Sequence, residues 1–82
     1  RMNFEVGQRV IARQDIVRAY QRGARSAACV ASGTLGTVIW VGALRHIEVR
    51  NIEVEFDNGA SILLMISCIR RLTPLEALAD QV

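Results

Sequence analysis

Segments rich in strand-forming residues alternate with short turns over most of this 82-residue chain. β-Branched and aromatic side chains dominate 35–41, which predicts a strand there, and 51–56 predicts another. Asn58-Gly59, between 51–56 and the apolar segment that follows, is a strong hairpin signal. Shorter segments predict the remaining strands at 8–14, 60–66 and 70–72. The pattern therefore predicts an all-β domain of about five strands.

The segment between the first two predicted strands has a different pattern. Ile16, Val17 and Tyr20 are spaced as on one face of a helix, with Asp15 in the position of an N-cap. We therefore expect one or two helical turns from Asp15, followed by a loop over 24–32.

The end of the chain predicts a short helix over about 74–82. Thr73 is placed as an N-cap, Pro74 as the first helical residue and Glu76 as the third, which together form a capping box. A helix of this length is not stable in isolation, so its apolar side must pack on the rest of the domain or on a neighbour. That apolar side consists of Leu75, Leu78, Ala79 and Val82.

The hairpin register decides which side chains of 60–66 enter the core. A two-residue turn at Asn58-Gly59 places Leu63 and Met65 in the core and leaves alternate aliphatic residues beside Glu53 and Glu55 on the outer face. A three-residue loop shifts the register by one and exchanges the two faces. With the two-residue turn, the outer face is too apolar to stay exposed, so either the C-terminal helix or another subunit must cover it. The expected oligomer interface is Ile62, Leu64, Ile66, Leu75 and Leu78.

Charge is unevenly distributed along the chain. The basic residues are all arginines, so chemistry that requires a lysine is excluded. Residues 1–50 carry eight arginines against three acids, a net charge of +5, whereas 51–82 carry two against five, a net charge of −3. The candidate contacts for an anion or nucleic acid are Arg9, Arg13, Arg18, Arg22 and Arg25.

Candidate catalytic and metal-binding groups are few. His46 is the one histidine, and the spacing of Cys29 and Cys68 gives no zinc motif, so we assign no catalytic residue, cofactor or metal. Both cysteines are expected to be buried free thiols. The chain has no apolar run long enough for a membrane span and no signal-peptide pattern, so we expect a cytoplasmic protein. The expected aromatic core residues are Phe4, Trp40 and Phe56.

Four short motifs resemble the small bacterial SH3-like barrels of the KOW and Tudor-like groups. They are Phe4-x-x-Gly7-x-Arg9-Val10, Gly33-x-x-Gly36-x-Val38, Val54-x-Phe56-x-Asn58-Gly59 and Ile69-Arg70-x-Leu72. The resemblance implies one domain over 1–82, with an SH3-like barrel at about 4–73 and the helix after it.

Two relatives within that group imply different activities. KOW domains imply binding to RNA or to ribosomal and transcription partners. The first and last motifs are also similar to plasmid-type dihydrofolate reductase, which works as a tetramer around a pore. The active stretch of that enzyme, Val-Gln-Ile-Tyr, is absent, and Ser61–Met65 reads Ser-Ile-Leu-Leu-Met.

Three functional hypotheses follow from the sequence. The leading one is a non-enzymatic binding or assembly module, homo-oligomeric or bound to another protein. The alternative is a nucleic-acid-binding module that uses the arginine-rich surface, and the third is a pore-type oligomeric reductase.

Overall fold

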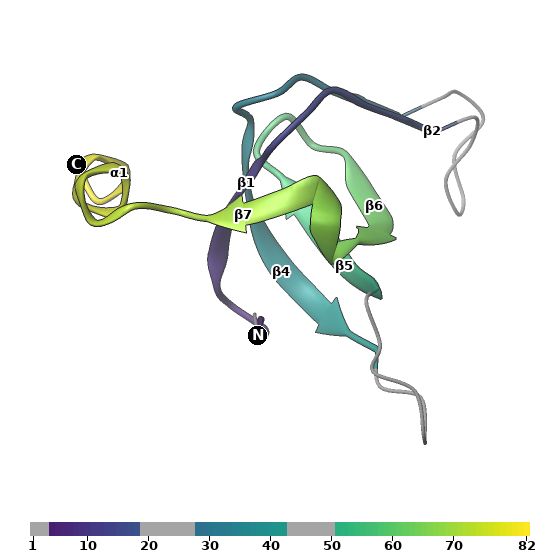
Figure 1. The fold of residues 1–82 in the computed structure, drawn as a ribbon, viewed down its shortest axis with the longest axis horizontal. Coiled ribbons are helices and arrows are strands. Elements are labelled where there is room, and N and C mark those ends of the chain that lie inside the picture. Colours follow the sequence, from purple (N-terminus) through teal and green to yellow (C-terminus); the bar gives the residue numbers. More distant parts are fainter. Residues whose placement is uncertain (1–3, 19–27, 43–50) are drawn as a thin grey trace.

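A computed structural model describes residues 4–18, 28–42 and 51–82. Most elements are strands, and the chain ends in one short helix (Figure 1). This confirms the expected all-β class with a short C-terminal helix. The elements are β1 (Arg9–Ala12), β2 (Ile16–Arg18), β3 (Ala28–Val30), β4 (Leu35–Val41), β5 (Asn51–Phe56), β6 (Ser61–Met65), the 3₁₀ turn η1 (Ile66–Cys68), β7 (Ile69–Arg71) and α1 (Pro74–Asp80).

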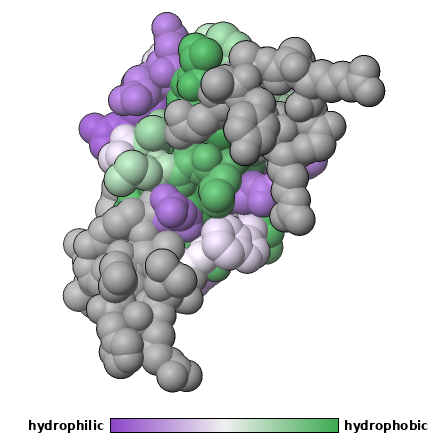
Figure 2. Space-filling view, turned by 90° about the vertical axis from the view of Figure 1, so that its right-hand side faces the viewer, coloured by the Kyte–Doolittle hydropathy of each residue, from purple (hydrophilic) through white to green (hydrophobic). Residues whose placement is uncertain are grey.

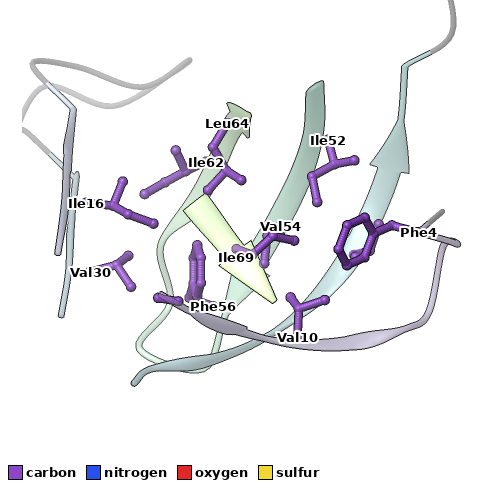
Figure 3. Close-up of a cluster of buried hydrophobic side chains, with 12 residues drawn as sticks. Phe4, Val10, Ile16, Val30, Ile52, Val54, Phe56, Ile62, Leu64 and Ile69 are labelled. Carbon is purple, nitrogen blue, oxygen red and sulfur yellow. The ribbon is translucent and has the colours of Figure 1, made fainter. Parts of the chain in front are cut away.

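The main sheet is antiparallel and has five strands in the order β6-β5-β4-β1-β7, while β2 and β3 pair separately as a hairpin. Ile16 and Val30, from that hairpin, point toward Phe56 and Ile62 of the sheet (Figure 3). One face of the sheet and this hairpin thus enclose one apolar core. Its buried members are Phe4, Val10, Ala12, Ile16, Val30, Val38, Ile52, Val54, Phe56, Ile62, Leu64 and Ile69.

The hairpin between β5 and β6 closes with three residues, so the register expected from a two-residue turn is wrong. The Phe56 N–H donates to the Ala60 carbonyl at 2.7 Å, and the Gly59 N–H donates to the Phe56 carbonyl at 2.9 Å. Gly59 has φ +94°, a conformation that glycine adopts without strain. Val54 therefore pairs with Ile62, and Ile52 with Leu64.

This register buries Ile62 and Leu64 at 1% and 2% exposure. Leu63 and Met65 lie on the outer face, opposite Glu53 and Asn51 respectively. The two faces of β6 are therefore exchanged relative to the expectation. Because Ile62 and Leu64 pack inside their own chain, they do not belong to an oligomer interface.

The expectations of helical turns from Asp15, of a loop over 24–32 and of buried cysteines are also wrong. Ile16–Arg18 forms a strand against Ala28–Val30, where helical turns and a loop were expected. Within that hairpin Val30 faces the core, so the neighbouring Cys29 is exposed, and Cys68 is half-buried. Residues 19–27 lie outside the described part of the chain.

Trp40 is not a core residue. The pairing of β4 with β5 shifts between Val38 and Trp40, so the regular inward–outward alternation is interrupted there. Trp40 is consequently 49% exposed and lies opposite Glu53. Phe4 and Phe56, by contrast, are buried as expected.

The register makes a direct prediction for stability. Leu64→Ala should destabilise the fold by about 2–5 kcal/mol because it opens a cavity in the core. Leu63→Ala removes an exposed side chain and should change stability by less than about 1 kcal/mol. Urea denaturation of the two variants measures both values, and a larger loss for Leu63→Ala would contradict the three-residue turn.

Candidate functional site

Arg9 joins four parts of the fold through its guanidinium group. It lies on β1 opposite Thr37 of β4, and its Nη1 donates to the Thr37 hydroxyl at 2.9 Å. Nη1 and Nη2 donate to the two carboxylate oxygens of Asp57, in the β5–β6 turn, at 2.9 and 2.7 Å. Nε and Nη2 donate to Asp80, in the last turn of α1, at 2.8 and 3.1 Å.

These bonds match the five N–H donors of a guanidinium group, and both aspartates are held bidentately. Hydrogen bonding to Arg9 lowers the pKa of Asp57 and of Asp80. The same bonds raise the pKa of Arg9, and the bond to Asp57 has the larger effect. Arg9 is therefore engaged within the chain, and its donors are not available to a phosphate or another external anion.

A second arginine–carboxylate pair holds the start of α1. Arg70 of β7 donates from Nη1 and Nη2 to the carboxylate of Glu76 at 2.8 and 2.9 Å. Glu76 also accepts the Thr73 N–H at 2.8 Å, and the Thr73 hydroxyl accepts the Glu76 N–H at 3.2 Å, which confirms the capping box. The bonds from Arg70, followed by that from the Thr73 backbone, lower the pKa of Glu76 to about 2.

The two pairs orient α1 with its charged residues toward the sheet and its leucines away from it. Glu76 and Asp80, the only charged residues of 73–82, both bind arginines of the sheet. Leu75 and Leu78 are 77% and 62% exposed, and no residue of the helix is buried. The apolar side expected to pack against the domain therefore does not do so, which reverses the usual orientation of an amphipathic helix.

A groove of about 380 Å³ separates α1 from the sheet. Ile11 and Leu35 line its sheet side, and Ala79 and Val82 line its helix side, together with Gly33, Glu76 and Asp80. The helix lies at one side of the molecule beyond the end of β7 (Figure 1). Ion pairs, rather than apolar packing, thus set its position.

The structure divides the residues proposed as an oligomer interface. Ile62 and Leu64 are in the core, and Ile66 is partly buried against it. Leu75 and Leu78 are on the surface together, at adjacent turns of α1. We call the exposed surface formed by Leu75, Leu78 and the following Gln81 the α1 outer face.

The arginines proposed as anion contacts do not form one described cluster. Arg9 is bound to two aspartates, and Arg13 is exposed after the end of β1. Arg18 is described only by its backbone in β2, and Arg22, Arg25 and His46 lie outside the described residues. The structural role of Arg9 was not predicted because Asp57 and Asp80 lie 48 and 71 positions away in sequence.

Other chemical sites are not apparent in the described ranges. Within 4–18, 28–42 and 51–82, no group of three or more histidine, cysteine, aspartate or glutamate residues is placed to hold a metal ion. No helix in that same part of the chain has the length and apolar character needed to cross a membrane. Family models, curated proteins and solved structures gave no match to this chain.

The position of α1 should depend on pH. Because the pKa of Glu76 in the folded protein is about 2, below its ordinary value of 4.5, its ion pair stabilises the folded state fully above about pH 4.5. That stabilisation is lost as the pH falls toward 2, and the lowered pKa values of Asp57 and Asp80 act in the same direction. We expect the amide resonances of α1 to shift over this range in an NMR titration.

Glu76→Gln provides the matched comparison. Glutamine can still accept the Thr73 N–H in the capping box, but it does not ionise and forms no ion pair with Arg70. The resonances at the start of α1 should therefore show a much smaller acid transition in this variant than in the parent protein. Equal transitions in both would show that the Glu76–Arg70 pair does not hold the helix.

Proposed function

We propose that this chain is a non-enzymatic assembly module with an SH3-like fold that associates with a second copy through the α1 outer face. The observation that carries the proposal is the reversed orientation of α1, in which the carboxylates face the sheet and the leucines face solvent. The polar side of α1 already binds arginines of the sheet, while its two leucines remain exposed. An exposed apolar patch of this kind is expected where another molecule covers it.

The charge distribution favours a second copy as that surface. In a two-fold symmetric dimer, each residue near the axis meets the same residue of the partner, so a charged face repels itself. The α1 outer face consists of Leu75, Leu78 and Gln81, none of which has a charged side chain. It can therefore contact an identical face without bringing like charges together.

The expected affinity is modest. Covering the exposed parts of Leu75 and Leu78 contributes about 1.5 kcal/mol per side chain, or about 6 kcal/mol for the four leucines of a dimer. The entropy lost on association opposes much of that gain. We therefore expect a dimer that dissociates on dilution.

Sedimentation equilibrium over a range of protein concentrations tests this proposal. The parent chain should shift from monomer to dimer as concentration rises, and Leu75→Gln/Leu78→Gln should remain monomeric at every concentration. Both positions are exposed, so the double variant should keep its fold, which circular dichroism can check.

The control is Leu63→Gln/Met65→Gln, which changes two apolar residues on β6 that are 55% and 53% exposed. This variant should dimerise like the parent chain. A parent chain that stays monomeric at the highest concentration, or a control variant that loses association while the α1 variant keeps it, would overturn the proposal. A gel shift that weakens steeply with salt would instead favour the nucleic-acid alternative.

A further inference from the structure

A second exposed surface lies on the outer side of β4, β5 and β6. In the sheet register, Trp40 lies opposite Glu53, and Glu53 lies opposite Leu63, so these three residues form one row across the strands. Glu55 and Met65 are exposed on either side of this row, Glu55 opposite Ser61 and Met65 opposite Asn51. We call these five residues the β4–β6 outer face.

The apolar members of this surface are large and accessible. Trp40, Leu63 and Met65 are 49%, 55% and 53% exposed. Figure 2 shows the side of the molecule on which β6 lies, where hydrophobic side chains gather in the middle and hydrophilic ones lie beside them. Apolar side chains interrupted by carboxylates match a ligand that has both an apolar stem and a positive charge.

The position of Trp40 is constrained by a glycine. A Cβ atom at Gly42 would lie 2.4 Å from Cη2 of the indole, so the ring packs directly against the Gly42 backbone. Gly42 is buried as a result. The indole thus lies over the Gly42 backbone at the outer surface of the sheet.

The two carboxylates of this surface differ from the other acids of the same half of the chain. Asp57 and Asp80 bind Arg9, and Glu76 binds Arg70. Within the part of the chain that the structure describes, Glu53 accepts one hydrogen bond, from the Ser61 hydroxyl at 3.2 Å. Among the described residues, no arginine pairs with Glu53 or Glu55. Glu53 lies opposite Trp40, and Glu55 lies two residues further along β5, opposite Thr37.

We propose that the β4–β6 outer face binds an extended, arginine-containing protein segment. A guanidinium group placed here would stack on the Trp40 indole and pair with Glu53, while its aliphatic stem would contact Leu63. Glu55 would pair with a second cation of the same segment. The two carboxylates repel nucleic acids and anionic membranes, so the surface favours a basic protein segment over either of these.

This surface is separate from the α1 outer face. In Figure 1, α1 lies at the left of the molecule and β6 at the right. A dimer through α1 would therefore leave the β4–β6 outer face open in both copies. Binding at one surface does not require binding at the other, and the two proposals can fail independently.

Trp40 is the only tryptophan in the chain, so its fluorescence reports on this surface alone. The probe is a short peptide of alternating glycine and arginine, titrated at low ionic strength. The same peptide with glutamate in place of arginine is the control. The arginine peptide should change the emission of Trp40 in a saturable way, and the glutamate peptide should not.

Neutral variants then separate a specific site from general charge attraction. Glu53→Gln and Glu55→Gln should each raise the peptide dissociation constant about three- to fivefold, the effect of losing one exposed ion pair. Glu5→Gln removes the same charge from an exposed position before β1 and should leave the constant unchanged. Binding by the glutamate peptide, or equal weakening by Glu5→Gln and Glu53→Gln, would overturn the proposal.

Discussion

The orientation of the C-terminal helix depends on the guanidinium group of Arg9. This group binds Thr37 of β4, Asp57 of the β5–β6 turn and Asp80 of α1, so one side chain connects the sheet, the hairpin and the helix. Turning the leucines of α1 toward the sheet would remove Asp80 from Arg9 and Glu76 from Arg70. Charge-assisted, bidentate hydrogen bonds of this kind are stronger than ordinary ones, and they oppose the burial of the apolar side.

The molecule has two exposed surfaces of different chemistry. The α1 outer face is apolar and uncharged because both acids of the helix are turned inward. The β4–β6 outer face combines an indole with two carboxylates that have no cationic partner among the described residues. The first suits contact with an identical surface, and the second suits a basic segment. Under the two proposals made above, the module would join copies of itself and hold a basic partner segment at the same time.

The sequence predicted the elements whose signals are local. Leu35–Val41 and Asn51–Phe56 have the predicted bounds because strand-forming residues fill them, and the capping box of Thr73 and Glu76 acts over three positions. The prediction failed where distant contacts decide the outcome. The strand at Ile16–Arg18 exists only because Ala28–Val30 pairs with it, and its local spacing looks helical.

The candidate site was predicted in part for the same reason. Helical periodicity predicted that Leu75 and Leu78 lie on one side of α1, and both are exposed there; their contact with a second copy stays a prediction. Ile62 and Leu64 were assigned to the wrong face because one additional residue in the turn exchanges the inward and outward faces of β6. Asp57, the first residue of that turn, is bound by Arg9, which lies far away in the sequence. The exposure of Trp40 follows from an irregularity in strand pairing that alternation along the chain does not reveal.

The most direct test is an isotope-filtered NOE experiment on a mixture of labelled and unlabelled chains at high concentration. The methyl groups of Leu75 and Leu78 should show contacts with α1 of the other copy and none with Ile11 or Leu35 of their own chain. The contrary result is contacts from those methyls to Ile11 and Leu35 within one copy. It would mean that the helix turns its leucines into the groove and that the arginine–carboxylate pairs do not set its orientation.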